Sequence, residues 1–137
     1  TGVDEPQKEG YQCTEDMTDQ AIGGRRQKKA IKPDKPFFSD YSAAGAHAHH
    51  HVSKEWIAKY KGKFDEGWDV LRERNLQKQI KAGIVPEGTQ MAKAPDSIPK
   101  WDSLTPQQQK IYARQAEVFA AFTEYSDYEA GRLIEAT

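Results

Sequence analysis

The segment 104-LTPQQQKIYARQAEVFAAFTEYSDYEAGRLIEA-136 contains the clearest helix start in the chain. Thr105 is a good N-cap, the proline after it suits the first helical position, and Gln108 can complete a capping box. Apolar side chains then recur at helical spacing over residues 111–134. The pattern predicts one long helix over this stretch, with a bend near Ser126, where Ser and Asp interrupt the apolar stripe.

Two further helices are predicted upstream, in a helical region over residues 53–82. Ser53 caps a short helix, and a longer one runs over residues 65–82 and ends at Gly83. The following segment, 84–104, contains several Pro and Gly residues and shows no periodicity. It is therefore predicted to be a long surface loop, leaving 105–136 for the long helix.

The N-terminal part contains one helix and the only segment with strand character. Residues 1–12 are polar and read as a flexible lead-in, after which Thr14 can cap a helix. Gly23 and Gly24 each cost about 1 kcal/mol in a helix interior, so we expect that helix to fray or end there. A short strand is predicted over 37–41, followed by a histidine-rich loop over 42–52. The chain is thus predicted to be mainly α, with at most one short strand.

Composition limits the classes of function. Of 137 residues, 36% are hydrophobic and 30% are charged, and the net charge is -1. No apolar run is long enough to cross a bilayer, and no global positive charge favours nucleic acid or an anionic membrane, so we expect neither as a partner. The single cysteine, Cys13, excludes an internal disulfide framework. The chain begins without methionine and stops inside a predicted helix, so we expect an excerpt of a longer protein.

All four histidines lie together, at His47, His49, His50 and His51. Imidazole binds zinc, copper and nickel, so the tract could capture a metal. A specific site needs ligands that converge from a fixed backbone, whereas adjacent residues of an extended chain point apart. We therefore expect adventitious transition-metal binding at His49, His50 and His51. No calcium site is expected in this chain.

Much of the sequence resembles bacterial arylsulfatases, which belong to the alkaline-phosphatase-like superfamily. The resemblance covers about residues 11–136. It includes the run 35-KPFFSDYSAAGAHAHHHVSKEWIAKYKGKFDEGWDVLRERNLQKQIKAGIVPEG-88. It is most specific in 59-KYKGKFDEGWDVLRER-74 together with 101-WDSL-104. This resemblance implies that residues 13–137 are part of a sulfatase domain and an excerpt of a larger α/β fold.

The resemblance also implies a reaction. Such enzymes hydrolyse sulfate esters with a formylglycine nucleophile and a calcium ion, and a loop histidine faces the ester and protonates the leaving oxygen. That histidine matches His47, which is the catalytic and substrate-binding candidate here. The implied partners of the parent are a small-molecule sulfate ester and the remainder of the sulfatase domain. The compartment of the parent, periplasm or cytoplasm, stays open.

Departures from the family pattern limit what this chain can do alone. His49 stands where the family usually has proline, and Ser39 and Asp40 replace apolar residues of a buried strand. Cys13 lies in QCTED, outside the C/S-x-P/A-x-R context needed for formylglycine, and no calcium-binding Asp-Asp or Asp-Asn motif is present. We therefore expect the isolated chain to be inactive. The alternative is a stand-alone helical module that binds a partner or a transition metal through His47–His51.

Overall fold

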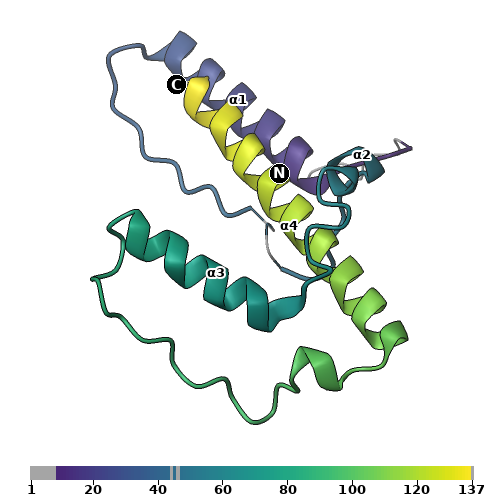
Figure 1. Cartoon of the computed structure of the whole chain (residues 1–137). Helices are drawn as coiled ribbons and strands as arrows, with labels where there is room; N and C mark the ends of the chain where they lie inside the picture. The colour runs from purple at the N-terminus through teal and green to yellow at the C-terminus, as the bar shows by residue number, and fades with distance from the viewer. Residues whose placement is uncertain (1–8, 44, 46, 137) are drawn as a thin grey trace. The chain divides into compact units, whose positions relative to one another are not determined.

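The computed structural model describes residues 9–43, 45 and 47–136, and its regular structure is helical. The α-helices are α1 (Cys13–Ile31), α2 (Lys54–Ala58), α3 (Gly67–Lys81) and α4 (Pro106–Glu135), and a short 3₁₀ helix, η1, spans Trp101–Ser103 (Figure 1). None of the described residues forms a β-strand, so the chain is mainly α, as predicted. Most of the expected lead-in, residues 1–8, lies outside the described residues.

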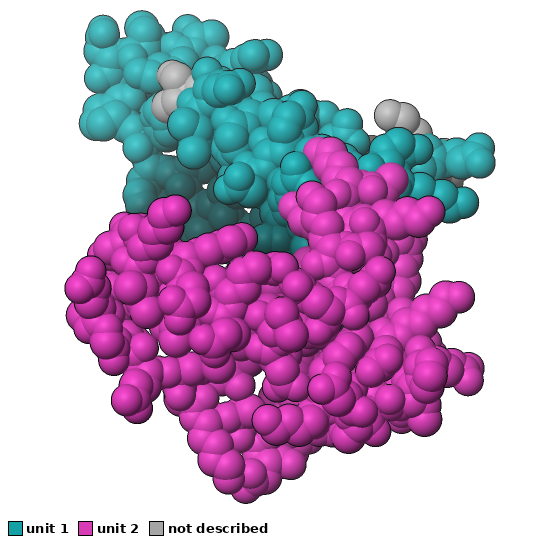
Figure 2. All heavy atoms as spheres, in the orientation of Figure 1, with its two compact units in different colours: residues 1–57, 119–137 teal, residues 58–118 magenta. Residues whose placement is uncertain are grey.

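The chain divides into two compact units, which are coloured separately in Figure 2. The first unit contains Thr1–Ile57 and Phe119–Thr137, and the second contains Ala58–Val118. The first unit therefore combines α1 with the C-terminal part of α4. The second combines α3, η1 and the N-terminal part of α4.

Helix α4 begins as its sequence predicts. The backbone N–H of Thr105 donates to Oε1 of Gln108 (2.9 Å), and the N–H of Gln108 donates to Oγ1 of Thr105 (3.3 Å). This reciprocal pair is the predicted capping box, which satisfies N–H groups that the first turn leaves without partners. The helix then continues unbroken past Ser126, whose hydroxyl donates to the carbonyl oxygen of Phe122 (2.9 Å).

The buried face of α4 coincides only in part with the predicted apolar stripe. Phe122, Tyr125 and Leu133 are buried, as predicted, whereas Ile111 (49%), Phe119 (44%) and Ile134 (73%) are exposed. The helix also buries Ala113, Glu117, Ala121 and Glu129, which together with Tyr125 and Leu133 form a row of every fourth residue. Periodicity does not predict the two carboxylates, because they can be buried only where partners neutralise them.

In the first unit, α1 runs alongside the C-terminal part of α4 (Figure 1). The guanidinium of Arg132 donates to Asp19 and to Glu129, both at 2.6 Å, and the guanidinium of Arg25 donates to the carbonyl oxygen of Leu133 (2.9 Å). These contacts tie charged groups of α4 and α1 to each other, and they give the buried carboxylate of Glu129 its partner.

Helix α1 continues through Gly23 and Gly24, so the expectation that it frays or ends there is wrong. Two interior glycines cost roughly 2 kcal/mol relative to alanine. However, the contacts that Asp19 and Arg25 make with α4 lie on either side of the glycines. Tertiary contacts on both flanks therefore hold the helix across its weakest point.

In the second unit, the start of α3 is shaped around Trp101. Gly67 has φ +81°, and a Cβ built at this position would lie 2.2 Å from the Trp101 ring. Only glycine combines this backbone conformation with such close approach. The N–H of Trp101 also donates to Oδ2 of Asp69 (2.9 Å), and the rings of Trp68 and Trp101 meet edge to face with centroids 4.8 Å apart. The glycine and tryptophans of 59–74 and 101–104 thus form one packed cluster.

The end of α3 and the loop after it are also held by hydrogen bonds. The N–H groups of Gly83 and Ile84 donate to the carbonyl oxygens of Ile80 (3.0 Å) and Gln79 (2.9 Å), which confirms Gly83 as the residue that ends the helix. Further along, Trp68 Nε1 donates to the Pro99 carbonyl (3.1 Å), so the irregular loop is attached to α3.

The helices that the structure describes include none that is both long enough and apolar enough to cross a membrane.

Candidate functional site

The segment that leads into the histidine loop is irregular. The strand predicted over 37–41 does not form. A strand needs a partner for its backbone N–H and C=O groups, and the described part of the chain contains no second strand. Phe38, at the start of this segment, is 94% exposed.

Tyr41 anchors this segment to α1. Its hydroxyl lies 2.7 Å from Oγ1 of Thr18, which in turn donates to the carbonyl oxygen of Thr14 (2.9 Å). Because the Thr18 proton is used in that second bond, the Tyr41 hydroxyl is the donor in the first. Thr18 is fully buried and Thr14 is 3% exposed. Sequence reasoning missed this network, although two threonines four positions apart are a visible signal for hydroxyls on one helix face.

Near Gly45 the loop passes close to α4. A Cβ built on Gly45 would collide with Oγ of Ser126, so the backbone of the loop lies directly over this serine. Any larger residue at position 45 would push the loop away from the helix. The segment is thus hydrogen-bonded to α1 through Tyr41 and lies close to α4 at Gly45.

The four histidines of the loop have different environments. His50 packs against α4, with its ring edge to face against Phe119 (centroids 5.2 Å apart) and 5.8 Å from Phe122. His47, His49 and His51 are exposed. The tract therefore uses one imidazole for packing and leaves the other three accessible.

His47, the predicted catalytic residue, makes one local contact. Its Nδ1 lies 2.5 Å from the carbonyl oxygen of Ala48. A carbonyl oxygen can only accept, so this contact requires the proton on Nδ1. Its exposure leaves the opposite ring nitrogen, Nε2, open to a ligand or substrate.

The predicted metal ligands are not assembled in one place. His49 and His51 lie near each other, with ring centroids 6.0 Å apart, whereas the ring of His50 contacts α4. Within 9–43, 45 and 47–136, no three His, Cys, Asp or Glu side chains are grouped so that they could hold a metal ion. Transition-metal binding by the tract stays a prediction, now with His49 and His51 as its nearest pair.

Cys13 is exposed at the first position of α1. Its sequence neighbours are Gln12, Thr14, Glu15 and Asp16. The structure therefore places the only thiol at a helix start on the surface, without the proline and arginine that the formylglycine motif requires.

Comparison with known proteins places the chain in a family. The family model described as Sulfatase matches residues 1–137. Over 110 residues the chain is 36% identical to an uncharacterized sulfatase of Schizosaccharomyces pombe, covering 80% of this chain and 20% of that protein. Over 107 residues it is 27% identical to an arylsulfatase of Klebsiella aerogenes, covering 78% of this chain and 23% of that protein. The chain spans about a fifth of the length of these relatives, and it belongs to the sulfatase family.

Proposed function

We propose that this chain is part of an arylsulfatase-like hydrolase of sulfate esters, in which His47 protonates the leaving oxygen. The observation that carries the proposal is the arrangement of the histidine loop. The chain is bonded to α1 at Tyr41 before the loop, His50 packs on α4 near its end, and His47 is exposed between these two contacts. A general acid needs this combination of a positioned backbone and an accessible ring.

The contact between His47 and Ala48 supports the same role. With Nδ1–H donating to the Ala48 carbonyl, a protonated imidazole presents Nε2–H outward. This proton can pass to the ester oxygen as its bond to sulfur breaks, so the alcohol leaves neutral. Proton transfer of this kind contributes typically ~10²- to 10⁴-fold to a rate.

The nucleophile and the calcium ion of the proposed reaction require residues that the described part of the chain does not provide. A formylglycine would supply the attacking oxygen and calcium would stabilise charge on the sulfate. Cys13 lacks the motif for the first, and no suitable group of ligands gathers for the second among the described residues. We place both, as part of the proposal, in the remainder of a complete sulfatase domain.

It follows that the isolated chain should not hydrolyse p-nitrophenyl sulfate, with or without calcium. Catalytic groups that act as a unit lose nearly all of their effect when the nucleophile is missing. The measurement is release of p-nitrophenol compared with a buffer blank. Calcium-dependent hydrolysis that persists through a second purification would contradict this part of the proposal.

The role of His47 can be tested by exchanging the loop. Residues 45–53 would replace the aligned loop of the Klebsiella aerogenes arylsulfatase, and His47→Ala would then be made in that chimera. We expect the chimera to retain activity and His47→Ala to reduce kcat by about 10²-fold or more. The loss should be larger for phenyl sulfate than for p-nitrophenyl sulfate, because the poorer leaving group depends more on protonation.

The matched control is His49→Ala in the same chimera, which should change kcat by less than about 3-fold since His49 has no role in the proposed proton transfer. An equal loss for the two esters would show that His47 is not the acid. A chimera without activity would show that this loop cannot replace that of an arylsulfatase, and the proposal would fail.

A further inference from the structure

Basic residues are concentrated in one short segment of the chain, 25-RRQKKAIKPDK-35. It contains six basic residues and one acidic residue, whereas the whole chain has 20 basic and 21 acidic residues. The remainder of the chain is therefore acidic on balance. Charges of one sign that are gathered at one place attract counter-ions locally, even in a molecule whose net charge is close to zero.

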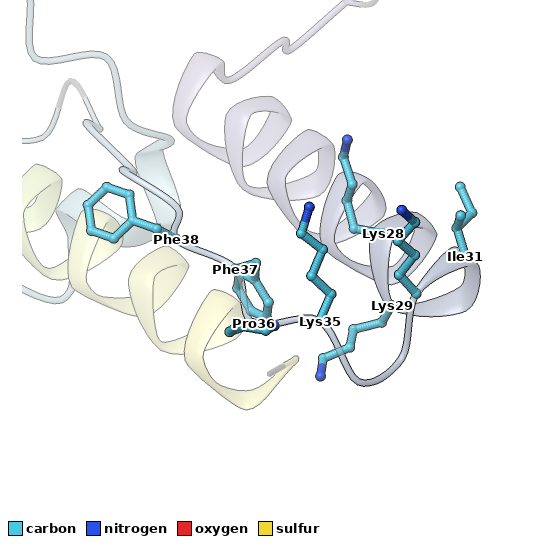
Figure 3. Close-up of a pocket in the computed structure, with 8 residues that line it drawn as sticks. Lys28, Lys29, Ile31, Lys35, Pro36, Phe37 and Phe38 are labelled. Atoms are coloured by element: carbon cyan, nitrogen blue, oxygen red, sulfur yellow. The ribbon is translucent and has the colours of Figure 1, made fainter.

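The structure gathers these cations around two hollows in the first unit. One hollow is lined in part by Lys28, Lys29, Lys32 and Lys35, and Figure 3 shows lysine side chains of this set extending from the last turns of α1 and from the segment that follows. The other is lined in part by Arg25, Arg26 and Lys29, so Lys29 belongs to both hollows. We call the set of six cations the basic row: Arg25, Arg26, Lys28, Lys29, Lys32 and Lys35.

The basic row is elongated along α1. Residues three or four positions apart lie on the same face of a helix, and successive turns are about 5.4 Å apart. Arg25, Lys29 and Lys32 therefore follow one another along the helix axis. Lys35 continues the row beyond the end of α1, where its N–H donates to the carbonyl oxygen of Lys32 (3.3 Å). A small anion would contact only part of this row, whereas a linear polyanion can contact its cations in succession.

Groups of the protein offset little of this charge. Among the residues that the structure describes, no Asp or Glu makes an ion pair with the basic row. Lys29 donates to the Pro33 carbonyl oxygen and Arg25 to that of Leu133, both at 2.9 Å, and these bonds leave the positive charges in place. The C-terminal ends of α1 and α4 carry about half a negative charge each, so the two helix dipoles compensate about one of the six charges.

The side chains around the two hollows provide charge but no groups that read a base. Besides the basic row, the lining residues are Ile31, Pro36, Phe37, Phe38 and Ala136, none of which has an amide, hydroxyl or carboxylate side chain. Recognition of base edges uses such groups, and binding of a single strand without sequence preference uses several aromatic rings on which bases stack in succession. The Phe37 ring is already covered by the Arg25 guanidinium, 5.0 Å from its centroid. Lysines, in contrast, bind phosphate as point charges.

From this arrangement we propose that the basic row binds inorganic polyphosphate, a linear chain of phosphate groups without bases. Phosphates along the chain contact the cations in succession, from Arg26 toward Lys35. The binding groups lie on α1 and in the turn after it, so no exposed aromatic ring is required. The inference does not rest on the role proposed for His47, because no residue of the loop over 42–52 lines either hollow.

The test uses the full chain and long-chain polyphosphate that carries a fluorescent label at one end. Binding is measured by fluorescence anisotropy, and the surface is located by the amide shifts of the ¹⁵N-labelled chain. We expect the affinity to fall at least about 10-fold between about 50 and 200 mM salt, because binding releases counterions from the polyanion. Orthophosphate at the same total phosphate concentration should not displace the probe. The largest amide shifts should fall within residues 25–35.

Two pairs of substitutions separate local contacts from net charge. Lys32→Gln with Lys35→Gln removes two exposed cations beyond the end of α1 and should reduce affinity by about 10-fold. It should also reduce the slope of log affinity against log salt by about 1 or more. The matched control is Lys100→Gln with Lys110→Gln, which makes the same change in net charge at exposed residues of the second unit and should alter affinity less than about 2-fold.

Three outcomes would overturn the proposal. Equal weakening by the control pair would show that only net charge matters. An unchanged salt slope in the Lys32→Gln, Lys35→Gln variant would show that these lysines do not contact phosphates. Tighter binding of an oligothymidylate with the same number of phosphates, lost in that variant, would show a surface for single-stranded nucleic acid instead of polyphosphate.

Discussion

Each of the two units of this chain has its own kind of internal contact. In the first, α1 is tied to α4 by a guanidinium shared between Asp19 and Glu129, and the leading edge of the histidine loop is tied to α1 by hydroxyl groups. In the second, two tryptophans meet at a glycine without room for a side chain. The first unit therefore adds charged and hydroxyl contacts between distant residues to its packed rings, and the second has its closest fit between a glycine backbone and a tryptophan ring.

The two units also differ in how closely they match the sulfatase sequence pattern. The second unit contains 59–74 and 101–104, where the family pattern is most specific, and those residues form its packed cluster. The first unit contains the departures at Ser39, Asp40 and His49, and there the predicted strand is missing. Shape-dependent packing leaves few choices of residue, whereas polar contacts at a surface tolerate more variation.

The largest effect is expected from Trp101→Ala, which should destabilise the second unit by about 3–5 kcal/mol. The substitution leaves a cavity beside Trp68 and Gly67 and removes the ring that determines the shape of the α3 start. Hydrogen exchange should show lost protection in α3 while the amides of α1 keep theirs. Equal loss in α1 and α3 would mean that the two units do not respond separately.

A smaller effect is expected in the first unit from Arg132→Ala, at about 2 kcal/mol. The carboxylate of Glu129, which is 2% exposed, would lose its charged partner. Asp19→Ala is the matched control. It removes the more exposed of the two carboxylates that pair with the Arg132 guanidinium, and it should cost less than about 1 kcal/mol. Urea unfolding followed at α1 gives the free energy of unfolding of both variants. A larger loss of stability in Asp19→Ala than in Arg132→Ala would contradict the assignment of Glu129 as the critical partner.

The second unit also contains one polar contact that makes it sensitive to pH. Burial alone raises the pKa of the Glu117 carboxyl. However, hydrogen bonds from Arg114 and from the Gly62 N–H, both 2.7 Å, outweigh it and lower the pKa below its ordinary value. As pH falls, the unfolded chain therefore takes up the proton first. The stabilisation is present above about pH 5 and is lost as pH falls through the lowered pKa of the folded state.

Glu117→Gln is expected to cost about 1 kcal/mol at pH 7, since it removes the charge and keeps an acceptor for Gly62. As pH falls through the lowered pKa of the folded carboxyl, the difference in stability between wild type and variant should shrink. The check is a series of urea unfolding midpoints, followed at α3, from pH 7 downward. A difference that does not shrink with falling pH would show that the charge of Glu117 contributes nothing.

The smallest effect on the fold is expected from metal binding to the histidine loop of the first unit. Nickel or zinc should bind at pH 7.5 with a dissociation constant on the order of micromolar. Calorimetry should show that His49→Ala with His51→Ala abolishes binding. His50→Ala should weaken it less than about 3-fold, because that ring packs on α4. Unaltered affinity in the double variant would exclude the tract as the site.

Local features of the molecule followed from the sequence. The capping box at Thr105, the end of α3 at Gly83 and the mainly helical structure of the described residues depend on residues within a few positions of each other. The membership in the sulfatase family followed from the motifs around Gly67 and Trp101. Hydrogen bonds between neighbours and close packing in a short segment leave a direct trace in a sequence.

Other features depend on tertiary contacts. Helix α1 continues through two glycines, Glu117 and Glu129 are buried in α4, and His50, unlike the other histidines, packs on α4. The partners that make these outcomes favourable are far away in the chain: Gly62 lies 55 positions from Glu117, and Asp19 lies 113 positions from Arg132. A buried charge or a weak helix is stable only when such a partner is present, and periodicity within one segment does not reveal it.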